Sequence, residues 1–178
     1  MNRTILAITA AAVLTGAVGC SSTSPDTTLA TSECRADRFA PPFQELDPCS
    51  AEPVLTAAVS TVFGYRPRQH ADPRAAFRAA SALMDPRFAE QAEPAALVWA
   101  PITIERFQHW QHDGVELTTT VRITADDHPP DTATNASRVL AVTLQPENQA
   151  DIEFAVYAHA RRASASSAWL LSGMEVAV

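Results

Sequence analysis

The spacing of apolar residues changes once along this chain, at Gly114. Before that glycine, apolar side chains recur every three or four residues, which places them on one face of a helix. After it they alternate with polar side chains, the period-two pattern of a half-buried strand. Helices followed by strands with hairpin-length connections predict an α+β fold, in which N-terminal helices pack on a four-stranded curved antiparallel sheet.

Helix-starting residues divide the segment before Gly114. Ser50 is a suitable N-cap, and Asp72-Pro73 and Asp85-Pro86 each place an N-cap before a proline at the first helical position. The apolar stripe of the second helix extends to Met84. The expected helices cover about 51–63, 73–84, 86–91 and 101–111.

The four expected strands follow Gly114 and cover about 115–124, 138–145, 152–161 and 168–178. The second strand is apolar on both faces, so it is expected in the middle of the sheet. Gly173 lies inside the last strand and predicts a β-bulge there.

The N-terminus has the pattern of an export signal. Arg3 precedes an apolar run over residues 5–18, which is shorter than the roughly 20 residues of a transmembrane helix and fits a signal peptide. The segment Ala17-Val18-Gly19-Cys20 resembles the bacterial lipobox, after which cleavage leaves Cys20 as the first mature residue, modified with lipid. The alternative is an ordinary cleaved signal followed by an unrelated cysteine.

This pattern divides the chain into a signal peptide (1–19), a lipidated Cys20 with a polar tether (20–33), a loop (34–49) and an α+β domain (50–178). At least two acyl chains on Cys20 would make the attachment durable, because each buried methylene contributes about 0.8 kcal/mol. The expected location is therefore the extracytoplasmic face of a bacterial cell membrane.

The mature chain is acidic. Its formal charge is 12 − 20 = −8 once Arg3 leaves with the signal, compared with −7 for the whole chain. Nucleic-acid affinity comes largely from cations that neutralise phosphates. This charge therefore argues against a nucleic-acid partner.

Two cysteines remain after Cys20, and both lie in one loop. An even number of remaining cysteines in an exported chain predicts a disulfide, here Cys34–Cys49. Zinc is the alternative, but two thiols without a nearby histidine are too few ligands. No cofactor is expected.

The order of elements resembles the cone-shaped cystatin-like fold of the nuclear-transport-factor-like superfamily, over roughly residues 50–178. Several segments look like actinobacterial exported proteins of conjugative elements, related to TcpC and type IV secretion bridging components: 72–76, 107–110, 126–131, 138–142 and the strand with Trp169. The resemblance implies an accessory role in conjugation or secretion. Those proteins are usually anchored by a transmembrane helix, whereas this chain is expected to be anchored by a lipid.

Two histidine- and acid-bearing segments were considered as metal sites. His109 and His112 lie one helical turn apart with Asp113 beside them, but a surface position near a helix C-terminus explains them equally. Residues 126–131 contain three Asp and one His, yet lack the ligand pattern of an EF-hand loop. A solvated loop is favoured there, and no metal is expected.

Relatives with this fold often carry a pocket between helices and sheet, and some use an Asp there as a base. The candidate lining residues of such a pocket are Trp99, Trp110, Tyr157 and His159, with core packing as the alternative for the tryptophans. No Asp falls in a buried strand stripe, and there is no Gly-x-Ser-x-Gly motif. Catalytic residues are therefore not expected.

Two functions remain open from the sequence. The first is a lipid-anchored interaction or assembly protein that associates with an envelope partner or with itself. The second is a small-molecule-binding or enzymatic domain that uses the pocket of the cone.

Overall fold

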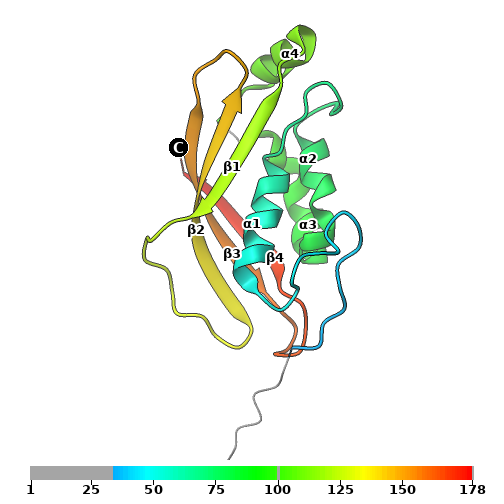
Figure 1. The fold of residues 1–178 in the computed structure, drawn as a ribbon, viewed down its shortest axis with the longest axis vertical. Helices are drawn as coiled ribbons and strands as arrows, with labels where there is room; N and C mark the ends of the chain where they lie inside the picture. The colour runs from blue at the N-terminus through cyan, green and yellow to red at the C-terminus, as the bar shows by residue number, and fades with distance from the viewer. Residues whose placement is uncertain (1–33, 100, 178) are drawn as a thin grey trace, which may run out of the picture. The chain divides into compact units, whose positions relative to one another are not determined.

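The computed structural model describes residues 34–99 and 101–177. It confirms the α+β fold: helices pack against a curved, four-stranded antiparallel sheet with the strand order β1-β2-β3-β4 (Figure 1). The helices are α1 (Ala51–Val62), α2 (Arg74–Ala79), α3 (Pro86–Ala92) and α4 (Ile104–Asp113), with 3-10 turns η1 (Ser81–Leu83) and η2 (Glu93–Leu97). The strands are β1 (Leu117–Ile123), β2 (Asn135–Pro146), β3 (Ile152–Arg161) and β4 (Leu170–Ala177).

The sheet is built from successive hairpins, so each strand pairs with its neighbour in sequence. The pairing is staggered: β1 pairs with the second half of β2, from Leu140 to Pro146, whereas β4 pairs with β3 from Ala155 onward. The predicted central place of β2 is confirmed. The predicted bulge is also confirmed, because His159 pairs with Gly173 and Ala160 pairs with Leu171, which leaves Ser172 as the extra residue.

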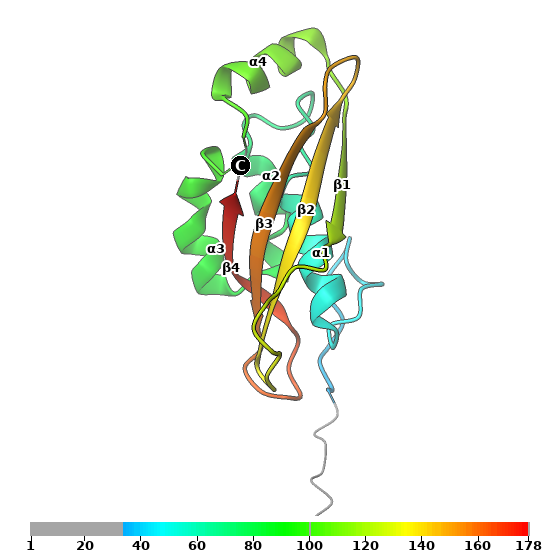
Figure 2. The ribbon, with the colours of Figure 1, turned by 90° about the vertical axis from the view of Figure 1, so that its left-hand side faces the viewer.

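The helices cover one face of the sheet and leave the other bare (Figure 2). On β3, Phe154, Val156 and Ala158 point into the core, and Tyr157 and His159 point to the bare face. This is the alternation that a strand with one wet face requires.

Helix α1 is the central element of the core and contacts all four strands. Its apolar residues recur at helical spacing, so they form one continuous face against the sheet. That face is fully or almost fully buried: Val54, Leu55, Ala58, Val59 and Val62.

The second helix is shorter than expected and ends at Ala79 instead of Met84. Met84 is extended and bridges Leu171, and the Asp85 amide donates to the Leu171 carbonyl at 2.8 Å. After Ala79 the chain tightens into the 3-10 turn η1, and pairing with the edge of β4 begins at Met84. Asp72 is not the N-cap, which is Pro73; its carboxylate instead accepts from the Arg74 side chain.

The third helix starts at its expected cap, and the fourth ends at Gly114, where the residue spacing changes. The Asp85 side chain accepts from the amides of Arg87 and Phe88, which starts α3. Helix α4 starts at Ile104, three residues later than expected, because the Thr103 side chain caps it. It ends at Gly114, whose φ of 67° is the left-handed conformation that glycine tolerates.

The predicted disulfide joins Cys34 to Cys49. Its loop is attached to the β3–β4 connection, since the Arg35 amide donates to the Ser166 carbonyl and the Trp169 amide donates to the Pro48 carbonyl. The apolar loop residues pack against the core: Phe39, Phe43 and Leu46.

Candidate functional site

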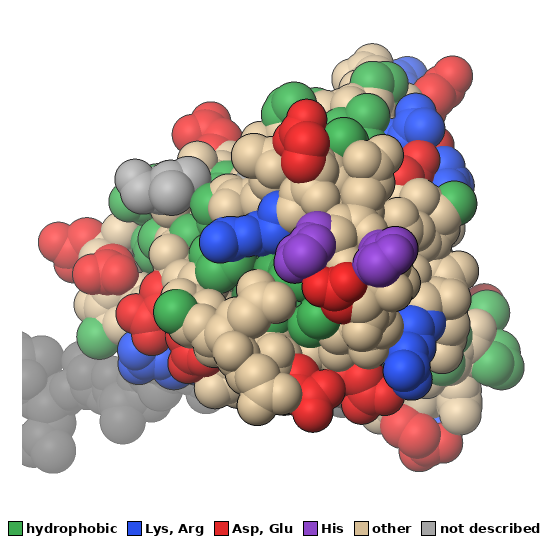
Figure 3. Space-filling model, turned by 90° about the horizontal axis from the view of Figure 1, so that it is seen from above, with side chains coloured by type: hydrophobic (Ala, Val, Ile, Leu, Met, Phe, Trp, Pro, Cys, Tyr) green, Lys and Arg blue, Asp and Glu red, His purple; other side chains and the backbone are tan. Residues whose placement is uncertain are grey.

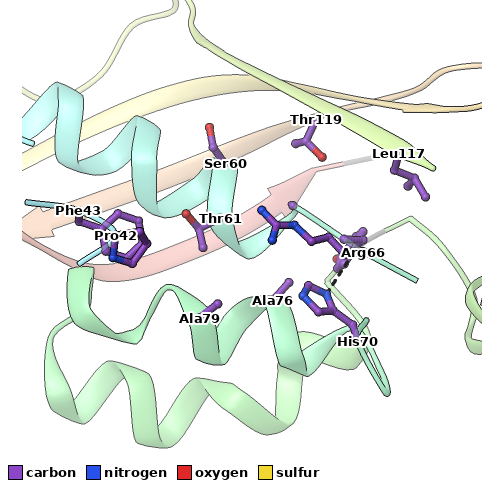
Figure 4. A pocket seen from close by; sticks show the side chains of 12 residues that line it. Pro42, Phe43, Ser60, Thr61, Arg66, His70, Ala76, Ala79, Leu117 and Thr119 are labelled. Atoms are coloured by element: carbon purple, nitrogen blue, oxygen red, sulfur yellow. Dashed lines mark hydrogen bonds between the residues drawn. The ribbon is translucent and has the colours of Figure 1, made fainter. Parts of the chain in front are cut away.

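A groove of about 600 Å³ lies between the C-terminal half of α1, helix α2 and the start of β1 (Figure 4). The disulfide-closed loop forms one wall through Pro42 and Phe43. The remaining lining residues are Ser60, Thr61, Gly64, Tyr65, Arg66, His70, Ala76, Ala79, Leu117 and Thr119. The groove is thus built from four segments that are distant in sequence.

A sharp turn after α1 shapes the polar end of this groove. At Gly64 a side chain would meet the Ser60 carbonyl at 2.8 Å, so the close approach of the backbone requires glycine. The turn is fastened by the Tyr65 amide, which donates to the Phe63 carbonyl at 2.8 Å. As a result Tyr65 points inward and Arg66 reaches along the groove (Figure 4).

The Tyr65 side chain is 3% exposed and lines the groove. Its ring makes edge-on contacts with Phe63 and Phe107. Burial raises the pKa of the phenol, so it stays neutral at physiological pH and keeps its proton as a donor. Its hydroxyl makes no hydrogen bond with any residue that the structure describes, so this donor is free to bind a ligand.

The lining hydroxyls of Thr61 and Thr119 are oriented by the backbone. Thr61 donates to the Ala57 carbonyl at 2.8 Å, and Thr119 donates to the Phe63 carbonyl at 2.9 Å. With their hydrogens used in this way, both oxygens present lone pairs.

His70 is held as a neutral ring at the same end. The Arg66 amide donates to its Nδ1 at 3.2 Å, which leaves Nε2 to carry the proton. Burial lowers the His70 pKa, and the charges of Arg66 and Arg78 lower it further against an opposing effect of Asp72. The imidazole therefore offers an N–H donor and no charge at neutral pH.

The groove contains a cation and no acid. Arg66 forms no ion pair with a described residue, and no Asp or Glu is among the described residues that line the groove. In a chain with 20 acidic residues against 13 basic ones, such a lining is unusual.

A second polar arrangement lies where β2 passes the start of α1. Arg138 is 8% exposed and donates to both carboxylate oxygens of Asp131, at 2.7 and 2.8 Å, and to Glu52 at 2.8 Å. These hydrogen bonds and charges raise the pKa of the guanidinium and lower that of Asp131. Because its donors are used within the protein, this cluster joins the 125–134 loop to α1 and offers no open site.

The structure does not bring the four predicted pocket residues together. Trp99 stacks on Phe88 at a centroid distance of 6.2 Å, and Trp110 is fully buried and donates to Gln149 at 3.0 Å. Tyr157 and His159 lie on the bare face of the sheet, where His159 Nδ1 is 2.9 Å from Ser137 Oγ. Strand alternation directs these two side chains away from the helices, and none of the four lines the groove.

The two segments considered as metal sites have other partners. His109 and His112 lie 3.1 and 2.7 Å from the carboxylate of Asp113, on the exposed end of the domain that carries α4 (Figure 3). In the 126–131 loop, Asp131 is paired with Arg138, and Asp126 accepts from Thr124 at 2.6 Å. Across residues 34–99 and 101–177, no three His, Cys, Asp or Glu side chains form a metal-binding group.

Sequence reasoning missed the groove, although one local signal for it was present. Gly64-Tyr65-Arg66 combines a helix stop, an aromatic residue and a cation directly after a buried helix. The signal is weak, because the other walls come from a loop, a helix and a strand that only the fold brings near.

The comparisons with known proteins give no relative. No protein family, curated protein or solved structure matches this chain. None of the helices in the described part of the chain is long and apolar enough to cross a bilayer. Cys20 and the expected signal and tether lie outside the described residues.

Proposed function

We propose that this protein is an exported lipoprotein, anchored by lipid at Cys20 to the extracytoplasmic face of the membrane, whose α+β domain binds a small molecule in the groove. The observation that carries this proposal is the groove itself. Its volume of about 600 Å³ falls within the range of about 300–1,000 Å³ that is typical of ligand sites. Its lining is also typical, with apolar walls and a few oriented polar groups.

The lining favours binding over catalysis. Acid–base or nucleophilic chemistry needs a carboxylate, a thiol or a hydroxyl activated by a base within hydrogen-bond reach. The Thr61 hydroxyl donates to a backbone carbonyl, and His70 Nδ1 accepts from a backbone amide. Both groups are therefore engaged with the backbone and not with each other.

The disulfide supports the proposed compartment, because such bonds persist in oxidising environments outside the cytoplasm. This observation agrees with the export signal expected from residues 1–19. It applies to the described domain and is independent of the lipobox resemblance.

The ligand can be sought on the full-length protein extracted mildly from its own membranes. Ala79 is exposed and lines the groove, so Ala79→Trp fills the site without entering the core. Ala82 is equally exposed but lies outside the groove, and Ala82→Trp is the matched control. Mass spectrometry of extracts is expected to find a small molecule on the wild type and on Ala82→Trp, and to find it depleted on Ala79→Trp. If the same amount of small molecule is recovered from all three proteins, the groove is not the binding site.

A second function is favoured by the bare face of the sheet (Figure 2). Tyr157 is 45% exposed on this face and pairs across the strands with Val139 and Glu175. The other outward residues mix small or hydroxyl-bearing side chains with charged ones: Thr118, Thr120, Ala141, Thr143, Ala155, Arg122 and Glu153. Such a face suits an assembly protein that binds an envelope partner or a second copy, as the resemblance to conjugation and secretion components implies. A photocrosslinker placed at Tyr157 is then expected to capture a partner protein. One placed at Gln91 on α3 is the control and should not capture it. The same crosslinked proteins from both positions would argue against this function.

A further inference from the structure

The arginines around the groove differ in whether an acid neutralises them. Arg68 lies 3.5 Å from Glu116, Arg74 lies 2.8 Å from Asp72 and Arg78 lies 2.9 Å from Glu93. Arg66 has no such partner among the described residues, and it alone of these four lines the groove. A guanidinium has a rigid fork of donors that fits a carboxylate or phosphate.

Arg66 and His70 lie toward one end of the groove, beside Ala76 and Leu117, and Pro42 and Phe43 lie at the other end (Figure 4). Thr61 and Ala79 lie between the two ends. The ligand that matches this arrangement has an anionic head and an apolar body. Phe43 packs on the domain core, so the apolar wall is preformed.

The number of charges in the lining separates a carboxylate from a phosphate. Arg66 is the permanent cation among the described lining residues, and His70 is neutral because its surroundings lower its pKa. A phosphate monoester carries about 1.5 to 2 negative charges at pH 7, which one cation leaves partly unbalanced. A carboxylate carries a single charge, which Arg66 balances, and His70 Nε2–H at the same end of the groove is a further donor.

We propose that the groove binds a single-chain monocarboxylate amphiphile of the fatty-acid type, with its carboxylate on Arg66 and its chain along Phe43, Pro42 and Ala79. This inference rests on the proposed binding function and names its ligand class. Arg66 is the residue that selects the charged head, and the loop closed by the disulfide holds the apolar chain.

The test is calorimetric titration of the full-length protein in nanodiscs with octanoate, with empty nanodiscs as the blank. Octanoate is expected to bind at one site per chain, and 1-octanol to bind more weakly. Because Arg66 is exposed, Arg66→Gln is expected to weaken octanoate about 2- to 5-fold, the loss typical of an ion pair that is open to water. The same variant should leave octanol binding unchanged. Arg68→Gln is the matched control and should bind octanoate as the wild type does.

Three outcomes would overturn the ligand class. They are equal binding of octanol and octanoate, octanoate binding that is unchanged in Arg66→Gln, and octyl phosphate binding more tightly than octanoate. After any of these three outcomes, the proposed binding function still holds if Ala79→Trp depletes the small molecule that is extracted from the native protein. If no probe binds and no molecule is extracted from the native protein, both the ligand class and the binding function fail.

Discussion

Arg138 is the buried charged side chain among the described residues. Two acids offset the free energy that its guanidinium loses when it leaves water. A buried guanidinium without partners would lose several kcal/mol of hydration. Here the guanidinium donates three hydrogen bonds to the carboxylates of Asp131 and Glu52 and a fourth to the Ser137 carbonyl. The cluster fixes the long connection between β1 and β2 against the start of α1.

Asp131→Asn is expected to destabilise the protein by about 1–2 kcal/mol at pH 7, since it removes a charge-assisted pair that is partly open to water. Arg138 lowers the pKa of Asp131 in the folded state, so the stabilisation is present above the unfolded pKa of about 3.9. It is lost as the pH falls through the folded pKa. Urea unfolding at pH values from 7 to 3 should therefore show that the difference in unfolding free energy between wild type and variant becomes smaller as the pH falls. Asp127→Asn, in the same loop and without an ion pair to a described residue, serves as the control.

A gap that stays constant with pH would contradict this account of Asp131. It would mean that the variant acts through the shape of the loop and not through the carboxylate charge.

At the scale of elements, the loop of residues 34–49 has little regular structure of its own and depends on its covalent closure. It contains neither a helix nor a strand within the described residues, and it contributes Phe39, Phe43 and Leu46 to the edge of the core. The same loop supplies one wall of the groove through Pro42 and Phe43. Stability and the proposed ligand binding therefore depend on the same disulfide-closed loop.

The double variant Cys34→Ser/Cys49→Ser is expected to lose about 3 kcal/mol of unfolding free energy, because a loop closed over 15 residues restricts the unfolded chain by about that amount. The melting temperature should fall by about 6–12 °C for a domain of this size. Differential scanning calorimetry measures the change, and wild type under reducing conditions should match the variant. Unchanged melting would show that the loop is held by its packing alone.

At the scale of the whole molecule, the staggered sheet explains where the groove lies. Strand β1 pairs with only one half of β2, and its inward residues are half-buried instead of fully covered. Leu117 and Thr119, at the start of β1, therefore stay open to the space between α1 and α2. The groove is the part of the helix–sheet interface that the helices do not fill.

The anchoring of the whole molecule is proposed to depend on Cys20. Cys20→Ala should remove the acyl modification and either release the protein from the membrane fraction or block its processing, because two acyl chains on Cys20 provide the attachment. Metabolic labelling with palmitate, membrane fractionation and the mass of the protein are the measurements. The Cys34→Ser/Cys49→Ser variant should stay labelled and membrane-bound, and a Cys20→Ala protein that is processed and retained in the membrane as the wild type is would refute the anchor.

Local patterns in the sequence were sufficient for most elements. The period-two run of β3 gave its residues, 152–161, correctly, and Gly114 and Asp85 marked helix ends because capping depends on neighbours in the chain. The second helix is shorter than predicted because its last turn is 3-10 and because Met84 and Asp85 pair with Leu171, which lies far along the chain.

The sequence by itself determined the fold class, the helix ends at Asp85 and Gly114, and the pairing of Cys34 with Cys49. All three follow from spacing and from the count of cysteines. Only the tertiary structure decided where Trp99, Trp110, Tyr157 and His159 lie, and that Arg66 and His70 face Phe43 across a groove. The physical reason is range: capping and periodicity act within a few residues, whereas a binding groove depends on which distant segments share one core and which face of a strand that core covers.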